Sequence, residues 1–517
     1  MELRALGGSW LVAALASLAL PFGDDWKSQR AELVKACTAD QDRATRENAI
    51  TKIGGHPGVD PTRALLTALD ECLAEQELLQ ARFDELSKEV QEILVGKQDV
   101  RLAAPKTKGQ IEERKKLGDK MLEEAALEEH LLATLGKRND DESVMLLGGL
   151  VGKPADWRTR ARLLDVVGRV GRKETAKDVH GALRDKDPRV RIAAIDAAVA
   201  LKQSESAPFV ASLLGDKEWP VRAAAVAALR KFRDRTTVTA AIDALAKETG
   251  RLREELADLL SELTGQTFGG EARAWAGWWE QNRESFLAAG ATAVAGAPAA
   301  GTPGPPPANA AARGSDEFSY YGIKTTSDKV VFVLDISDSM NDDAGETELP
   351  ADGIPKRVGN LRPKIQVARD QLAQTIVDLP GGATFALITY NKFVKAWQDK
   401  LVPANKRWKN EALSYVLGIQ ATDATNIFDA LELALSLGGR GLADKYYASQ
   451  VDTIFFLTDG KATEGRIQEP AKILDEIRRI NKFGKVKIHT IGVGYLHDRP
   501  FLEQLAKENG GTYVNVQ

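Results

Sequence analysis

The first half of the chain carries apolar residues at helical spacings. Between Leu65 and Ile93 they recur in alternating steps of four and three, with a single polar member. This heptad seam predicts a long helix with coiled-coil character. A segment over 96–108 that contains Pro105 interrupts the pattern, and a second, highly charged helix is predicted over 109–135. Together they predict a helical hairpin whose apolar stripes pack on each other or on the next domain.

From about residue 147 the hydrophobic pattern becomes an internal repeat. The segments Asp156–Arg160, Asp187–Arg191 and Glu218–Arg222 follow one another at intervals of 31 residues. A fixed period of this length is typical of stacked helical units. We expect each acidic residue to cap a helix and the arginines to pair with aspartates between repeats. The alternative use of a regular arginine series is nucleic-acid binding.

The repeats over 147–263 resemble HEAT repeats. The resemblance implies an α-solenoid with a protein-binding surface. The next segment, 272–286, places Trp275, Trp278 and Trp279 on one face of a helix. We expect this helix to cap the open end of the solenoid, and stacking of the three indoles on sugars is the alternative.

Composition changes abruptly at residues 287–315. This segment is almost entirely Ala, Gly, Pro, Thr and Ser, and Arg313 is its only charge. Such a sequence cannot bury a core, so we predict a disordered linker. A linker of this kind would let the two flanking parts move independently.

The last third of the chain alternates strand-like and helix-like segments. Buried apolar runs predict strands over 330–334, 384–390, 393–397, 453–457, 487–493 and 512–516. Amphipathic segments between them predict helices. This alternation predicts a Rossmann-like, doubly wound and mainly parallel sheet with helices on both faces. The predicted fold class is multidomain: an all-α hairpin and solenoid, followed by an α/β domain.

Charge and motif content exclude several classes of protein. The 517 residues include 70 Lys and Arg against 74 Asp and Glu, a net charge of −4, which argues against a basic nucleic-acid binder. The sequence contains neither a P-loop nor an H-E-x-x-H motif, and two cysteines cannot form a four-cysteine zinc site.

The N-terminus reads as a secretory signal over 1–23. An apolar run from Trp10 to Leu20 is followed by helix-breaking and polar residues, and it is too short to span a bilayer comfortably. A buried N-terminal helix is the alternative. We therefore expect export to a periplasm, a cell envelope or the extracellular space, with no further membrane span. In that setting Cys37 and Cys72 could form a disulfide, or remain buried thiols.

Oxygen-bearing side chains follow three predicted elements of the α/β domain. Asp335-Ile336-Ser337-Asp338-Ser339 follows the strand 330–334, Thr425 opens a helix, and Thr458-Asp459-Gly460 follows the strand 453–457. The carboxyl ends of parallel strands meet at one edge of a sheet. A D-x-S-x-S segment, a later Thr and a later T-D-G resemble the metal-ion-dependent adhesion site of the von Willebrand factor type A (VWA) domain. The resemblance covers about residues 326–517, and the five matching positions are Asp335, Ser337, Ser339, Thr425 and Asp459.

The resemblance implies a role for each of these residues. Ser337 and Ser339 would bind a cation directly, and Thr425 directly or through water. Asp335 and Asp459 would accept hydrogen bonds from metal-bound water. Hard oxygen ligands suit Mg²⁺, with Mn²⁺ or Ca²⁺ as alternatives. An open coordination position would then accept an Asp or Glu side chain of a partner protein, so the expected function is non-enzymatic, metal-dependent protein binding.

Two features depart from the pattern of the VWA family. Asp338 stands where the family often has glycine, and its charge either joins the metal shell or weakens attraction for acidic ligands. The insertion 341–361 is rich in Gly, Asp and Pro, and its acidic residues either cover the metal or form a solvated loop. A metal-dependent enzyme, with His497 as its best candidate base, and a purely structural envelope protein are the alternative functions.

The predicted organisation has five parts. They are a signal peptide (1–23), a helical and coiled-coil region (24–146), a HEAT-like solenoid with a Trp-rich cap (147–286), a linker (287–315) and a VWA domain (316–517).

Overall fold

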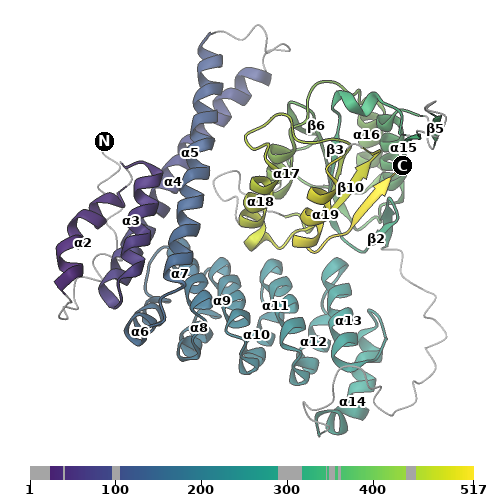
Figure 1. Ribbon diagram of the computed structural model, residues 1–517. Helices are drawn as coiled ribbons and strands as arrows, with labels where there is room; N and C mark the ends of the chain where they lie inside the picture. The colour runs from purple at the N-terminus through teal and green to yellow at the C-terminus, as the bar shows by residue number, and fades with distance from the viewer. Residues whose placement is uncertain are drawn as a thin grey trace. The chain divides into compact units, whose positions relative to one another are not determined.

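The computed structural model describes residues 24–38, 41–95, 105–288, 317–344, 346–348, 356–358, 362–437, 450–495 and 497–516 (Figure 1). The expected signal peptide and nearly all of the expected linker lie outside these ranges. The chain forms two compact units that meet between Ala241 and Ile242. The second unit therefore contains the last two helices before the linker as well as the C-terminal domain.

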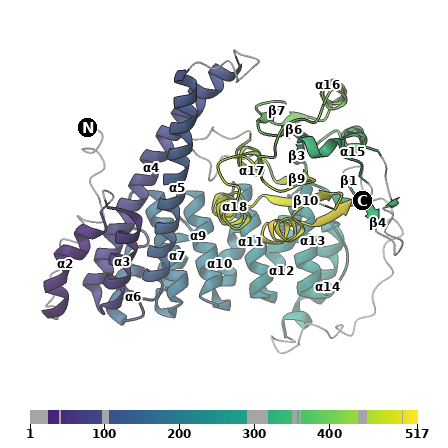
Figure 2. The same ribbon diagram turned by 45° about the horizontal axis from the view of Figure 1, so that its top comes forward.

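The first unit begins with the expected helical hairpin. Helices α4 (Val59–Val95) and α5 (Pro105–Leu135) run side by side (Figures 1 and 2), after the shorter helices α2 (Asp24–Ala36) and α3 (Arg43–Gly55). Their apolar residues are buried along the predicted seam, where Leu79 and Phe83 of α4 pack on Met121 of α5. The hairpin is thus held together by its heptad stripe, as the sequence predicts.

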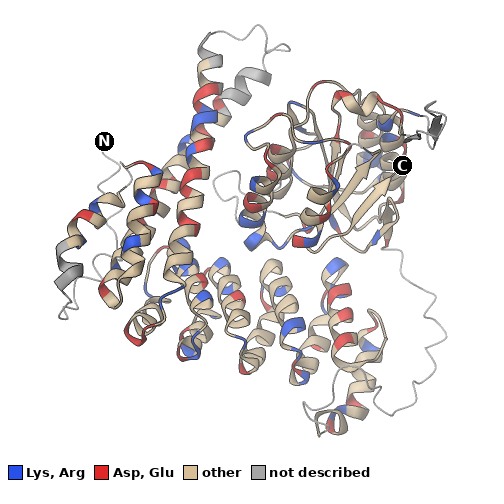
Figure 3. Cartoon of the chain, in the orientation of Figure 1, with Lys and Arg blue, Asp and Glu red and all other residues tan. Residues whose placement is uncertain are grey.

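The polar faces of the hairpin carry both signs of charge. Acidic and basic side chains follow each other along α4 and α5 (Figure 3). An amphipathic helix that binds membranes would instead have a mainly cationic polar face. Among the described residues, no helix combines the length and apolar content needed to cross a bilayer.

Cys37 and Cys72 are both free and buried, so the structure does not contain the disulfide that the sequence allowed. The Sγ of Cys72 donates a hydrogen bond to the Glu124 carbonyl at 3.4 Å. Burial raises the pKa of the Cys37 thiol to about 11, which keeps it protonated and unreactive at neutral pH.

The helices of the repeat are α6 (Asp141–Leu150), α7 (Trp157–Val170), α8 (Ala176–Ala182), α9 (Pro188–Ala200), α10 (Ala207–Ala211), α11 (Trp219–Phe232) and α12 (Val238–Leu245). From α7 onward, alternate helices of the repeat begin at the predicted interval of 31 residues, and α6 precedes them outside this register. Asp156 caps α7 by accepting from the Thr159 backbone N–H, and Asp187 caps α9 through the N–H of Arg189. Glu218 precedes α11 without a side-chain capping bond, so the expected capping holds for two of the three repeats.

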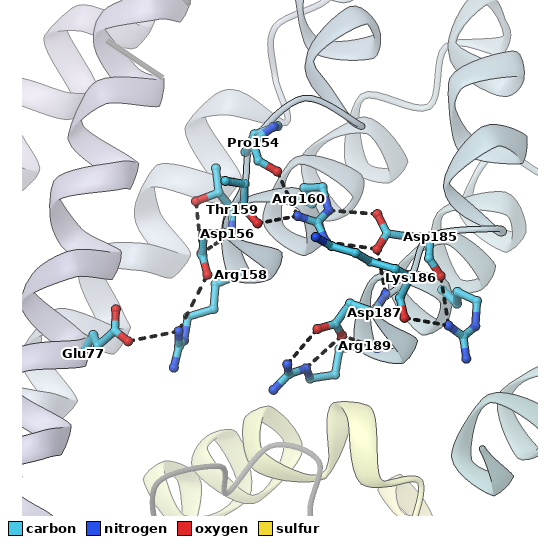
Figure 4. A network of polar contacts seen from close by, with 12 residues as sticks. Glu77, Pro154, Asp156, Arg158, Thr159, Arg160, Asp185, Lys186, Asp187 and Arg189 are labelled. Carbon is cyan, nitrogen blue, oxygen red and sulfur yellow. Dashed lines mark hydrogen bonds and ion pairs between the residues drawn. The ribbon is translucent and has the colours of Figure 1, made fainter. Parts of the chain in front are cut away.

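The arginines form the expected ladder between repeats (Figure 4). The Arg160 guanidinium lies 2.8 Å from the Asp185 carboxylate, and Arg191 lies 2.7 Å from Asp216, one repeat further along. Arg160 also donates to the carbonyls of Pro154 and Ala155, both at 2.8 Å. Each guanidinium therefore joins the loop before its own helix to the loop before the corresponding helix of the next repeat. These contacts explain the 31-residue spacing without any nucleic acid.

Replacing Arg191 by methionine should destabilise the first unit. The side chain is 8% exposed, pairs with Asp216 and donates to the carbonyl of Asp185. Loss of these contacts should lower the free energy of unfolding by about 2–3 kcal/mol. Arg43→Met is the control, because Arg43 is 46% exposed in its pair with Glu47 and should cost less than about 0.5 kcal/mol. Urea unfolding of the two variants measures the difference, and equal midpoints would contradict the ladder's role.

The second unit opens with α13 (Gly250–Thr264) and α14 (Ala272–Ala288). Trp275 and Trp279 of α14 are buried and pack with Phe268 and Phe286. The indole N–H of Trp275 donates to the Gly269 carbonyl at 2.8 Å. Trp275 and Trp279 thus belong to a small aromatic core between α14 and the loop before it, and the capping of the solenoid stays a prediction.

The C-terminal domain contains the expected parallel sheet. Its strands are β3 (Lys329–Asp335), β6 (Thr384–Tyr390), β7 (Val394–Ala396), β8 (Val402–Pro403), β9 (Thr453–Thr458), β10 (Lys487–Val493) and β11 (Tyr513–Val516). The strand order is β11-β10-β9-β3-β6-β7, and β8 also pairs with β6. Strands β11, β10, β9, β3 and β6 are parallel, whereas β7 and β8 are antiparallel to β6.

Helices cover both faces of the sheet (Figures 1 and 2). On one face, Phe332 and Leu334 of β3 share a core with α15 (Lys364–Asp378) and α16 (Lys406–Leu417). The alternate residues of the strand point to the other face, which is covered by α17 (Ile427–Ser436), α18 (Pro470–Gly484) and α19 (Arg499–Glu508). A hairpin of β1 (Phe318–Tyr320) and β2 (Ile323–Thr325), which the sequence analysis missed, adds Phe318 to the first core.

Helix α13 contacts the edge of the sheet at which the strands begin. The Arg251 guanidinium donates to the carbonyls of Asp452, just before β9, and Lys485, just before β10. Glu255 pairs with Lys487 at 3.2 Å. Residues that the sequence assigned to the end of the repeats thus form part of the same compact unit as the sheet.

A buried histidine on β10 predicts a pH-dependent stability. His489 is 5% exposed, stacks on Phe455, and accepts from the Thr512 N–H through Nδ1 at 3.0 Å. Burial lowers its pKa to about 3. At pH values between this pKa and that of the unfolded chain, His489 is protonated in the unfolded chain and neutral in the folded domain. The contribution of the neutral imidazole to the free energy of unfolding is fully present above the unfolded pKa of about 6.5 and is lost as the pH falls towards 3.

His489→Asn should weaken this dependence, because an amide oxygen can keep the bond from Thr512. Between pH 7.5 and pH 5 the wild type should lose about 2 kcal/mol more stability than the variant. Hydrogen exchange of the β10 and β11 amides at the two pH values measures it. Identical pH slopes would contradict the assignment.

Candidate metal site

The five predicted ligands lie at the edge of the sheet where the strands end. Asp335 is the last residue of β3, and Ser337 and Ser339 follow it into a short helical turn, η7 (Asp338–Asn341). Asp459 directly follows β9, which pairs with β3. Thr425 lies two residues before α17. Parallel pairing of β3 and β9 therefore brings the two aspartates together, as expected from their positions after these strands.

Asp335 forms the buried base of the site. It is completely buried, its Oδ1 accepts from the Ser337 N–H at 2.8 Å, and its Oδ2 accepts from the Thr458 hydroxyl at 2.6 Å. Burial, with the nearby charge of Asp459, raises the pKa of the Asp335 carboxyl to about 6. A desolvated carboxylate of this kind is stabilised by a nearby positive charge.

Hydroxyl and carboxylate oxygens converge above Asp335. The hydroxyl oxygens of Ser337 and Ser339 are 3.2 Å apart, and Ser339 Oγ donates to Asp459 Oδ1 at 2.9 Å. A Cβ added to Gly460 would lie 3.8 Å from Thr425 Oγ1 and 3.9 Å from Ser339 Oγ. Thr425 thus faces the same cluster, and all five predicted side chains contribute to one site.

The chemistry of these groups fits a hard divalent cation. Among the described residues, no group of three or more His, Cys, Asp or Glu side chains is arranged to hold a metal ion, and the candidate site here combines hydroxyls with two carboxylates. Three hydroxyls and two carboxylates form an all-oxygen set, which suits Mg²⁺, Mn²⁺ or Ca²⁺ better than zinc. The cation would supply positive charge and an open coordination position between the serines and Asp459.

One residue of the site was missed by the sequence analysis. Lys364, the first residue of α15, extends its ammonium group to Asp459 Oδ2 at 2.8 Å and to the Ser339 carbonyl at 3.3 Å. The side chains of the pair are 5% and 0% exposed. A lysine at the start of an amphipathic helix usually points to solvent, so no sequence pattern indicated this contact.

A loop after β9 holds Thr425 in place. The Thr425 N–H donates to the Thr463 hydroxyl at 2.9 Å, and its carbonyl accepts from the N–H groups of Thr463 and Glu464. Next to it, Asn426 caps α17 by accepting from the Asp429 N–H. Gly465, at φ +99°, passes so close to Asn426 that a Cβ would lie 2.0 Å from its Oδ1.

A buried arginine fixes the same loop to α17. Arg466 lies 3.2 Å from the Asp429 carboxylate, is also ion-paired with Glu432, and covers the ring of Phe428. This arrangement positions the loop and the start of α17, and so the threonine ligand between them. The sequence showed these residues only as ordinary helix and loop positions.

The structure describes Asp338 fully and the insertion only in part. Asp338 is exposed and accepts from the Asn341 side chain at 3.1 Å, so in the structure it is not part of the oxygen cluster. The insertion contains a small antiparallel pair, β4 (Glu346–Glu348) and β5 (Lys356–Val358). The side chains of Glu346 and Glu348 lie outside the described ones, so the covering of the metal stays a prediction.

His497, the candidate base, is engaged elsewhere. Its Nε2 lies 2.7 Å from the Tyr513 hydroxyl. A Cβ on Gly492 would lie 2.4 Å from the same nitrogen, so the ring fills the space beside β10. Burial lowers the pKa of His497. Packing between β10 and β11 accounts for the position of this imidazole.

Comparisons with known proteins agree with this architecture. The family model for HEAT repeats matches residues 153–230 and 180–263, and the model for the von Willebrand factor type A domain matches residues 359–515. The chain carries a VWA domain preceded by HEAT-like repeats.

Inter-alpha-trypsin inhibitor heavy chains match a little over a third of this chain. Inter-alpha-trypsin inhibitor heavy chain H4 of Homo sapiens is 32% identical over 195 residues, which cover 38% of this chain and 19% of the relative. Heavy chain H3 of Bos taurus is 29% identical over 195 residues, with the same shares of the two chains. The match therefore spans about a fifth of the length of these relatives. Among solved structures, a von Willebrand factor type A protein from Catenulispora acidiphila is 20% identical, with a TM-score of 0.29 over 37% of this chain and 40% of that one.

Proposed function

We propose that this protein is a non-enzymatic, metal-dependent protein-binding module on a helical scaffold. Its VWA domain would hold a divalent cation, Mg²⁺ in the first place, between Ser337, Ser339 and Thr425. Asp335 and Asp459 would fix the water molecules around the cation. The open position would capture an Asp or Glu side chain of a partner protein.

The observation that carries this proposal is the convergence of hydroxyls at the end of β3. Hydroxyls bind a cation without neutralising it, so the cation remains attractive to a further anionic ligand. A carboxylate from a partner is the natural ligand, because it is hard and negatively charged. The partial match to inter-alpha-trypsin inhibitor heavy chains supports an interaction role.

The location of the protein is part of the same proposal. We infer export to a periplasm, a cell envelope or the extracellular space from the apolar run Trp10–Leu20. An alkaline phosphatase fusion after Asp25 tests this inference, because that enzyme is active only in an oxidising compartment. An inactive but intact fusion would contradict export.

Capture of partners from an envelope extract tests the binding function. The full chain, immobilised in millimolar Mg²⁺, should retain proteins that are released by chelator. Ser337→Ala should retain none of them, since it removes a direct ligand from a residue that carries no charge. Proteins retained equally with and without chelator, and by both chains, would contradict metal-dependent capture.

A further inference from the structure

A buried lysine of the VWA domain places its ammonium group at the proposed metal site. The Lys364 ammonium lies 2.8 Å from Asp459 Oδ2, while the other oxygen of the same carboxylate accepts from Ser339. Both side chains are almost entirely buried. A buried lysine that is paired this closely is held in place, because separating the pair would leave two desolvated charges.

The path of this side chain is built into the fold. Gly494, directly after β10, has φ +73°, and a Cβ there would lie 2.9 Å from Lys364 Cε. The glycine thus leaves room for the lysine stem to pass from α15 to Asp459. The Lys364 N–H is fixed as well, since it donates to the Asp342 carbonyl at 2.9 Å.

The charges around the site show what the lysine does. Asp335 and Asp459 bring two carboxylates into a space from which water is largely excluded, and Lys364 compensates one of them. A divalent cation that binds between the serines and Asp459 would lie close to the Lys364 ammonium group, which has the same sign of charge. Like charges this close repel strongly where water does not screen them.

We propose that Lys364 is a built-in counter-cation that competes with the divalent cation for Asp459. The lysine keeps the site assembled, and it weakens cation binding below what five oxygen-bearing side chains would otherwise provide. This inference rests on the proposed metal site and adds a residue that sets its affinity. The fraction of sites that hold a cation would then change with the free Mg²⁺ concentration, and the amount of captured partner would rise and fall with it.

Titration with Mn²⁺ tests the inference directly. Lys364→Met keeps the apolar stem and removes the ammonium, so Mn²⁺ should bind at least tenfold tighter to this variant of the full chain than to the wild type. Lys461→Met is the matched control: Lys461 is exposed and lies two residues from Asp459, and its replacement should change the affinity less than threefold. Calorimetry or the paramagnetic signal of free Mn²⁺ measures both.

A second readout concerns stability. The melting temperature of the wild type should change little when Mn²⁺ is replaced by chelator, because Lys364 still compensates Asp459. The melting temperature of Lys364→Met should fall clearly in chelator and recover with Mn²⁺. Lys364→Gln provides a second test should the methionine variant fold poorly.

Three results would overturn the inference. They are equal or weaker Mn²⁺ affinity of Lys364→Met, an equal gain in Lys461→Met, and no Mn²⁺ binding by either variant or the wild type. Failure of the proposed function looks different: Lys364→Met would still gain affinity for Mn²⁺, whereas envelope proteins would be retained regardless of chelator.

Discussion

Replacing Asp459 by alanine should both remove cation binding and destabilise the VWA domain. The carboxylate accepts from Ser339 and forms the buried ion pair with Lys364, whose side chain is 5% exposed. Without Asp459 the ammonium group stays buried beside the Ser339 carbonyl without its ion-pair partner. Breaking one partner of such a pair typically costs about 3–5 kcal/mol.

The double variant separates the two effects. Asp459→Ala combined with Lys364→Met removes both charges, so most of the lost stability should return while cation binding stays absent. Chemical unfolding of the single and double variants, followed by Mn²⁺ titration, measures each effect separately. A double variant as unstable as Asp459→Ala would show that the lysine is not the source of the cost.

Replacing Gly465 by alanine should disrupt the loop that holds Thr425. The residue has φ +99°, where a side chain is strained, and the added Cβ would lie 2.0 Å from Asn426 Oδ1. The backbone strain alone costs about 1–3 kcal/mol, and displacement of Asn426 would also remove the cap of α17. We expect a loss of about 3 kcal/mol or more, together with at least tenfold weaker Mn²⁺ binding.

Gly382→Ala is the control for this substitution. Gly382 precedes β6, has no positive φ, and has no atom within 4 Å of an added Cβ. Its replacement should leave both stability and Mn²⁺ affinity nearly unchanged. Unchanged affinity in Gly465→Ala, despite reduced stability, would mean that the loop does not position the threonine ligand.

The convergence of the candidate ligands could be predicted because its signals are local. Asp335, Ser337 and Ser339 lie within five residues after an apolar strand, and Asp459 follows a second strand of the same kind. Parallel pairing then brings the two strand ends together without any detailed knowledge of packing. The arginine ladder was equally accessible, since a period of 31 residues repeats the same contact along the chain.

Contacts that depend on tertiary packing were not accessible in this way. Lys364 reaches Asp459 across 95 residues of sequence, through a space that only the backbone of Gly494 makes available. The Arg466 pairs likewise depend on how one loop lies on α17. The hairpin β1–β2 was missed for another reason, because strands of three residues are too short to show an alternating pattern.

The contact between α13 and the sheet lies at the edge opposite to the candidate cation ligands. Arg251 and Glu255 contact the edge where strands begin, whereas the candidate cation ligands lie where they end. The seven residues of β3 connect these edges, a distance of about 23 Å at 3.3 Å per residue. A partner bound at the candidate cation site would therefore contact the end of the domain opposite to α13. Tension between an anchored scaffold and a captured partner would run along the parallel strands, whose hydrogen bonds would bear it in shear.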